Sequence, residues 1–160
     1  MATMKMRGLE EYEAQLLQLQ NLSRECIGRA IYAGAKEIAD QVKQAIESLP
    51  IDERQVKNGE TLHGISAAQK QGLIDGFGIA RLQDDNGFLN VKLGFHGYNS
   101  VRTNSYPNGQ PNSMIARSVN SGSSFRDKIP FVDNAVNAKK SACEQAMIKA
   151  FDEEIKKTVK

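Results

Sequence analysis

The feature that most constrains the fold of this chain is a long stretch of helical periodicity near its N-terminus. From Glu10 to Leu49, apolar residues recur mostly at three- and four-residue spacings, with charged residues between them. Pro50 ends the stretch, because the residue before a proline resists helical geometry. Unbroken, such a helix would measure about 60 Å, which is long for a chain of 160 residues. Asn21–Ser23 could kink or divide it, since Asn and Ser compete for backbone hydrogen bonds.

A second amphipathic helix is predicted from Pro130 to the C-terminus, and Pro130 suits the first turn of a helix. Its apolar face is formed by Phe131, Ala135, Ala138, Ala142, Ala146, Ala150 and Ile155. The first helix contains a stretch of small residues that would let another helix approach closely. These are Ala30, Ala33, Gly34, Ala35 and Ala39.

A β-hairpin is predicted between the two long helices. Apolar Leu89, Val91, Leu93 and Phe95 alternate with polar or small residues, as in a half-buried strand. Asn86-Gly87 supplies the positive φ angles of a tight turn, and residues 79–82 would form the partner strand. A two-stranded hairpin is marginal alone and needs a helix packed on its apolar face, which the long helices supply.

The remaining segments are predicted to be a short helix and two loops. Ser66 with Gln69 forms a capping-box pattern at the start of a helix over 66–74. Residues 51–61 have no periodicity and are expected to form a mobile loop. Gly94–Asp127 is rich in Gly, Asn, Ser and Pro and is expected to form a long arm. The expected fold is therefore one α+β domain over 1–160, with two long amphipathic helices packed on a small antiparallel hairpin.

Composition limits the classes of protein to which this chain can belong. The chain has 21 Lys and Arg against 19 Asp and Glu, a formal charge of +2, which argues against a broad nucleic-acid-binding surface. No apolar run approaches the roughly 20 residues that span a bilayer, and Glu10 and Glu11 follow Met1–Arg7 where a signal peptide would be apolar. Cys26 and Cys143 are expected to be buried free thiols, as in the cytoplasm.

The sequence motifs that would indicate a catalytic, metal or phosphate-binding site are present only in part. His63 and His96 have no Cys or His partner at zinc-ligand spacing. Residues 84–87 lack the later Glu of a calcium loop and are better explained as a turn. Residues 121–124 lack the strand–turn–helix setting of a nucleophilic serine, and the glycines at 72, 76 and 78 lack the Lys-Ser/Thr of a phosphate loop. We therefore expect no enzymatic activity, cofactor or metal.

Several segments, in order and at fixed spacing, resemble the tail-completion or head–tail joining (neck) proteins of long-tailed, siphovirus-type bacteriophages. They are Gly8–Tyr12, Ala39–Lys43, Leu49–Pro50, Lys70–Leu73, Val91–Asn99, Gly109–Asn112, Ala116–Ser118, Ser121–Phe125 and Pro130–Phe131. The chain departs from the family at His96, where an acidic residue is expected. The resemblance covers most of the chain and brings no active site with it.

The resemblance implies a structural virion protein that lacks catalysis and cofactors. Such proteins are expected to form homo-oligomeric, hexameric rings that cap the head-proximal end of the tail tube and meet the head connector. Passive contact with DNA in the channel is implied, and contact with a membrane is not. The protein would be made in the host cytoplasm, from a phage or prophage, and end in the tail or neck of the virion.

The arm over 94–127 is the predicted interface, because a segment that orders on contact delays assembly until a partner is present. Interface free energy concentrates in a few aromatic and arginine side chains. Four aromatic anchors are predicted, namely Phe95, Tyr98, Tyr106 and Phe125. Three arginines would pair with acidic groups of a neighbour, namely Arg102, Arg117 and Arg126.

Two other functions remain open from the sequence. The Arg- and Tyr-containing loop over 95–126 could stack and clamp single-stranded nucleic acid, which would make the chain a small nucleic-acid-binding module. A hydrolase would require Ser, His and carboxylate groups that converge in one pocket, which neither His63 nor His96 indicates by its spacing.

Overall fold

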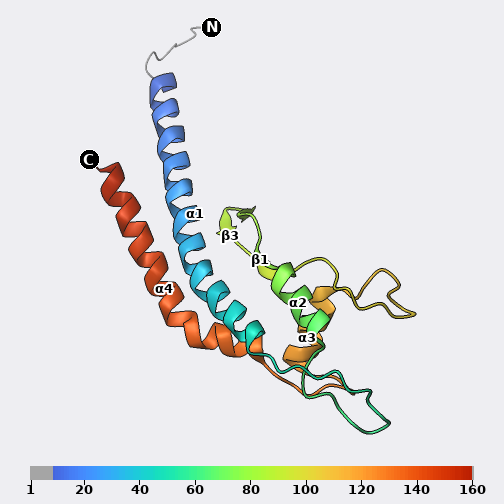
Figure 1. Cartoon of the computed structure of the whole chain (residues 1–160). Coiled ribbons are helices and arrows are strands. Elements are labelled where there is room, and N and C mark those ends of the chain that lie inside the picture. Colours follow the sequence, from blue (N-terminus) through green and yellow to red (C-terminus); the bar gives the residue numbers. More distant parts are fainter. Residues whose placement is uncertain (1–8, 160) are drawn as a thin grey trace.

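The computed structural model describes the backbone of residues 9–159 and the side chains of residues 13–159. Two long helices, α1 (Leu9–Glu47) and α4 (Phe131–Thr158), run antiparallel as an extended pair (Figure 1). Two short helices, α2 (Ala67–Gly76) and α3 (Asn112–Ser121), lie with the strands beside the lower half of this pair (Figure 1). The predicted α+β class is confirmed. The N-terminal segment Met1–Arg7, considered above as a signal peptide, lies outside the described residues.

The predicted long helix α1 is continuous through Asn21–Ser23, so the predicted division does not occur. Ser23 Oγ donates to the carbonyl of Gln20 within the helix. The stretch of small residues lets α4 approach closely, as predicted. A Cβ at Gly34 would lie only 2.4 Å from Met147 Cγ and 2.9 Å from Cys143 Sγ, so a larger side chain would push α4 away.

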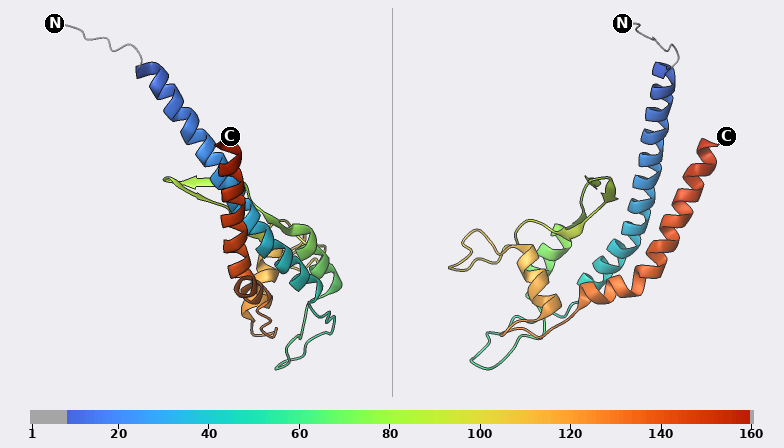
Figure 2. Two further views of the ribbon diagram at one scale, coloured as in Figure 1. Left: turned by 90° about the vertical axis from the view of Figure 1, so that its left-hand side faces the viewer. Right: turned by 180° about the vertical axis from the view of Figure 1, so that it is seen from behind.

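The helix α1 has 39 residues and α4 has 28, so α1 continues beyond the end of α4 (Figures 1 and 2). Thr158 and Val159, at the end of α4, lie against Leu19 and Leu22 of α1. We call residues 9–18 of α1 the overhang. No helix among residues 9–159 is long and apolar enough to cross a membrane.

The predicted hairpin forms, with Asn86 (φ 56°) and Gly87 (φ 91°) in its turn. Strand β2 (Gln83–Asp85) pairs with β3 (Phe88–Asn90) near the turn, and β1 (Phe77–Ile79) pairs with β4 (Leu93–Phe95) at the base, all antiparallel. Three residues separate β1 from β2 but only two separate β3 from β4. The extra residue breaks the ladder as a bulge does, so the single strand predicted over 89–95 is split in two. The partner strand predicted over 79–82 is wrong in its bounds, because residues 80–82 form this break between β1 and β2.

The hairpin lies along α1 through polar contacts. Tyr32 Oη accepts a hydrogen bond from the backbone N–H of Leu82 at 2.8 Å. Near the hairpin turn, Asp84 pairs with Arg24 of α1 at 2.8 Å. These contacts hold the hairpin against the middle of the long helix.

The core sits where the lower ends of the long helices meet the short elements. Ile46, Ile65, Leu73 and Val119 are completely buried there. Phe95 packs against Phe77 and Phe131, with ring centroids 5.1 and 6.2 Å apart. The core also contains Ala39, Val42, Leu49, Phe77, Ile115, Ala116, Phe131 and Ala135. Burying these apolar side chains holds α2, α3 and the base of the hairpin against the two long helices.

The predicted arm over 94–127 requires correction, because its middle is helix α3. Ile115, Ala116 and Val119 of α3 are buried in the core, and buried Asn112 donates from Nδ2 to the carbonyl of His96 at 2.9 Å. Tertiary contacts here override the weak helix propensity of Asn and Ser. The part that projects is residues 98–110, closed at its base by a hydrogen bond from Asn99 N to Gln110 O at 2.9 Å (Figure 1). We call it the projecting loop.

Candidate interaction surfaces

One of the seven predicted interface residues, Arg126, lies inside the protein, and Phe95 is half-buried against the core. Phe95 belongs to the aromatic cluster described above. Arg126 is only 3% exposed. Its Nη2 donates to Gln69 Oε1 at 3.3 Å, and desolvation by burial lowers the pKa of its guanidinium. Arg126 cannot act as a surface anchor while the chain keeps this fold, whereas Phe95 is accessible only through the groove that it lines.

Arg126 is part of a polar network that joins α2, α3 and the base of the projecting loop. Its Nη1 lies 3.5 Å from Ser118 Oγ of α3, and Gln69 Nε2 donates to Gln110 Oε1 at 2.8 Å. Nothing in the local sequence signals this role, because Arg is rarely buried and a Ser-rich segment indicates exposure.

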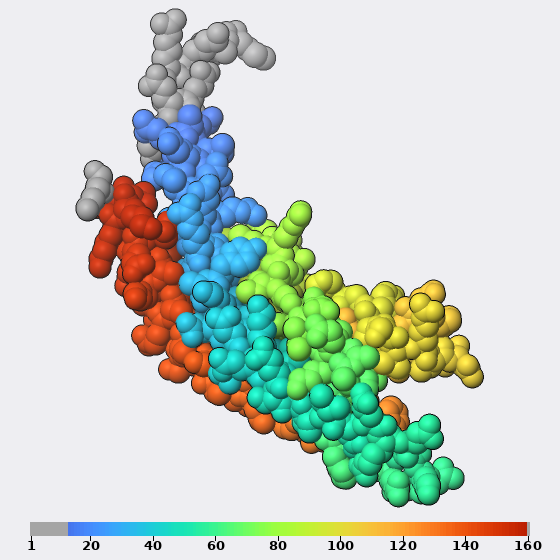
Figure 3. All heavy atoms as spheres, viewed as in Figure 1, coloured from blue at the N-terminus to red at the C-terminus, as the bar shows by residue number. Residues whose placement is uncertain are grey.

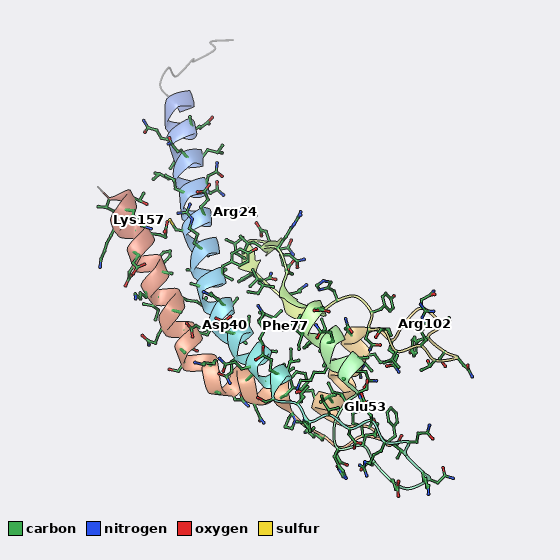
Figure 4. All side chains as sticks on the ribbon, in the orientation of Figure 1. Arg24, Asp40, Glu53, Phe77, Arg102 and Lys157 are labelled. Atoms are coloured by element: carbon green, nitrogen blue, oxygen red, sulfur yellow. The ribbon has the colours of Figure 1, made fainter. Side chains whose placement is uncertain are left out.

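The other five candidates are at least partly accessible but lie in three separate places. Tyr98, Arg102 and Tyr106 belong to the projecting loop, and Figure 4 shows Arg102 far out on it. Arg117 is exposed on α3, at the rim of a groove. Phe125 is half exposed, next to the isolated backbone bridge between residues 62 and 126. The structure therefore divides the predicted interface into three surfaces.

The groove beside Arg117 has a volume of about 520 Å³. Its floor is apolar and comes from α1, β1, β4, α3 and α4, with Ile38, Val42, Phe77, Leu93, Phe95, Ala116, Val132 and Val136. Arg117, Asn120, Ser113 and Ser121 supply polar groups. An apolar side chain with a nearby acid would suit this groove. The sequence could not reveal it, because the residues that line it come from five elements.

A second apolar surface lies at the free end of the helix pair. Leu16, Leu17 and Leu19 are 48, 62 and 60% exposed. Just below them, a shallow cleft of about 220 Å³ is lined by Leu22 and Cys26 of α1, by Phe151 and Ile155 of α4, and by Val159, which follows α4. In Figure 3, the blue N-terminal part of α1 stands clear of α4 and of the rest of the molecule. Leu16 and Leu19 belong to the apolar spacing of the predicted first helix, which does not reveal whether a partner covers them.

A polar cluster ties down the loop over 51–61, which projects at the lower end of the molecule (Figure 3). Arg54 donates from Nε and Nη2 to the carboxylate of Asp52 at 2.9 and 2.8 Å, and the backbone N–H of His63 donates to it at 2.8 Å. Asp127 accepts from Thr61 Oγ1 and pairs with His63 Nδ1. Hydrogen bonds to the charged forms lower the pKa of both carboxyl groups, mainly from Arg54 for Asp52 and from Thr61 for Asp127.

This cluster is not arranged as a nucleophilic triad. Acyl transfer requires the imidazole to lie between the hydroxyl and the carboxylate. Here the carboxylate of Asp127 lies between Thr61 and His63. His96 lies elsewhere, with its backbone N–H bonded to the carbonyl of Gly76 at 2.9 Å. In the described part of the chain, no group of three or more His, Cys, Asp or Glu is placed to hold a metal ion.

Comparisons with protein-family models, with curated proteins and with solved structures find no match to this chain. The geometry above and the ordered sequence segments are therefore what supports a functional proposal.

Proposed function

We propose that the chain is a structural, non-catalytic component of a bacteriophage particle, of the tail-completion or head–tail joining type. It assembles as a homo-oligomeric ring at the neck or tail end and contacts the connector and the tail tube. The phage context of this proposal rests on the ordered segments that resemble that family, such as Val91–Asn99 and Gly109–Asn112.

The assembly role rests on one observation: large apolar and aromatic side chains are exposed on several separate projecting parts. Leu17 is 62% exposed on the overhang, Phe88 is 78% exposed on the hairpin, and Tyr98 is 68% exposed on the projecting loop. Contiguous exposed apolar surface, such as that of Leu16, Leu17 and Leu19 on α1, marks an interaction surface. Surfaces on separate projections suit a subunit that meets sister copies and two other virion proteins at once.

The test is electron microscopy of particles from the phage or prophage that encodes this chain, with and without its gene. We expect free heads and free tails when the gene is absent, and joined particles when the wild-type gene is restored. The protein itself should be found in purified particles by mass spectrometry. Normal joined, infectious particles without the gene would overturn the proposal.

A second variant tests the projecting loop. Residues 101–108 are replaced by a short Gly-Ser linker, which keeps the Asn99–Gln110 hydrogen bond and leaves α3 in the core. We expect a helical, folded protein by circular dichroism that no longer restores joining. The matched control places the same linker over residues 55–58 of the loop that ends at Thr61. Full restoration by the 101–108 variant would remove the projecting loop from the interface.

A further inference from the structure

The end of the hairpin presents an exposed aromatic ring beside a carboxylate. Phe88 is 78% exposed, more than any other aromatic side chain in the described part of the chain. Asp85 lies directly opposite it in the antiparallel ladder, so both side chains lie on the same face of the hairpin. The neighbouring Asp84 is on the other face and pairs with Arg24 of α1 at 2.8 Å. Phe88 and Asp85 therefore point away from α1, and the end of the hairpin projects past α1 in the left view of Figure 2.

The charge of Asp85 is not compensated by any described cation of the chain. Its carboxylate accepts a hydrogen bond from Asn90 Nδ2 at 2.9 Å, which holds it on the hairpin. Tyr98 and Phe125, the two other described aromatic side chains that are more than half exposed, lack such an acid. The projecting loop with Tyr98 contains no Asp or Glu, and Asp127, two residues after Phe125, is bonded within the polar cluster of the loop over 51–61.

The groove beside Arg117 offers the complementary groups. Its floor is apolar and includes the rings of Phe77 and Phe95. Arg117 is exposed at its rim and forms no ion pair with another described side chain. The carboxylate of Asp133 is held at a different lining residue, Asn120, whose Nδ2 donates to it at 3.1 Å. An aromatic ring with a carboxylate beside it therefore matches both the floor and the rim.

The hairpin of the same chain cannot fill this groove. Its end is fixed to α1 at Arg24, whereas α1 reaches the groove at Ile38, fourteen residues further along. At 1.5 Å per helical residue, this separation is about 20 Å. A second copy, which the proposed function supplies, carries the same hairpin without this restriction.

We propose that the end of the hairpin of one copy inserts into the groove of a second copy, with Phe88 on the apolar floor and Asp85 paired with Arg117. One aromatic side chain buries about 150–250 Å², against roughly 1,200 Å² or more in a stable interface, so this contact is the anchor of a larger interface. It joins two unlike patches, and head-to-tail repetition gives a ring where the rotation between copies closes. The inference rests on the self-assembly in the proposed function and names the residues that perform it.

Three single variants test the contact, namely Phe88→Ala, Asp85→Arg and Arg117→Asp. All three positions are exposed, so each variant should keep the wild-type circular dichroism. Sedimentation velocity and native mass spectrometry of the full chain, from micromolar to millimolar concentration, measure the assembly. Each variant alone should shift the assembly midpoint at least about tenfold to higher concentration, because interface free energy concentrates in a few anchor side chains.

An equimolar mixture of the two charge variants gives the sharpest readout. Each variant alone places like charges at every contact, which opposes binding. In the mixture, the changed hairpin of one variant meets the changed groove of the other, and the next contact joins the two unchanged surfaces. Assembly should return close to the wild-type midpoint, with equal numbers of the two variants in each ring. An effect within one chain, on folding or between its own two positions, is not repaired by mixing.

Matched controls use exposed positions away from the hairpin and the groove. Val159→Ala removes an apolar side chain that is 80% exposed, and it should leave the midpoint unchanged. Asp152→Arg and Lys140→Asp make the same changes of charge at exposed positions of α4, and neither should move the midpoint by as much as the hairpin and groove variants.

The outcomes distinguish the contact from the proposed function. Weakened assembly for each single variant, with rescue in the mixture, supports the contact. Wild-type assembly that the three variants leave unchanged, or that the mixture does not restore, overturns the contact but leaves self-assembly intact. A wild-type protein that stays monomeric up to millimolar concentration overturns the self-assembly and the contact together.

Discussion

At the scale of single residues, Arg126 is a charged side chain that stabilises the interior of the protein. Its side chain joins α2 and α3 through Gln69 and Ser118. We expect Arg126→Ala to lower the free energy of unfolding by about 1–3 kcal/mol, because the buried amide of Gln69 loses a partner. Arg117→Ala, at an exposed position, should change it by less than about 0.5 kcal/mol. Urea unfolding followed by circular dichroism measures both, and equal effects would contradict this assignment.

The residues that could be predicted from the sequence are those whose roles are set by close neighbours. Asn86-Gly87 determines the hairpin turn, and Ser66 with Gln69 forms the capping box across three residues. Arg126 depends on Gln69, 57 residues away, and this distance removes any local signal. The same reason explains why Phe95 was expected at an interface although it packs against Phe77 and Phe131.

At the scale of elements, periodicity predicted α1 and α4 because long amphipathic helices repeat their signal over many turns. Helix α3 was missed because its ten residues are mostly polar and follow Pro111. The buried positions of Ile115, Ala116 and Val119 stabilise it, and they depend on the packing of α1 and α4. The apolar island at Met114–Ala116 was the one visible signal of this helix.

The carboxylate of Asp127 holds the loop over 51–61 to the rest of the chain, and its ionisation affects stability. The pKa of Asp127 lies below its ordinary value of 3.8 in the folded state. Its contribution to stability is therefore present above pH 3.8 and disappears as the pH falls through the lower, folded pKa. We expect Asp127→Asn to be less stable than wild type near neutrality and to lose less stability on acidification. Urea midpoints from neutrality to below pH 3.8 check this. Asp152→Asn, at an exposed position, should follow the wild-type profile.

At the scale of the whole molecule, the sequence predicted the class of fold but not its shape. Two helices of unequal length leave the overhang free, and two loops project from the other end (Figures 1 and 2). Which apolar residues remain exposed follows from this offset between α1 and α4. Leu16 and Val42 belong to similar helical patterns, yet only Val42 reaches the core. Periodicity identifies an apolar face, but the arrangement of partners decides whether that face is buried.

The distribution of charge over the molecule gives a test that separates assembly from nucleic-acid binding. The formal charge is +2, Arg126 is buried, and Arg102 is the only cation in the projecting loop. Binding to single strands weakens with salt in proportion to the number of phosphate contacts, and one or two contacts give little affinity. We expect no retained complex with single-stranded DNA in a gel shift at about 0.15 M salt. A complex that survives this salt and is lost with Arg102→Gln would favour a nucleic-acid-binding role for the loop.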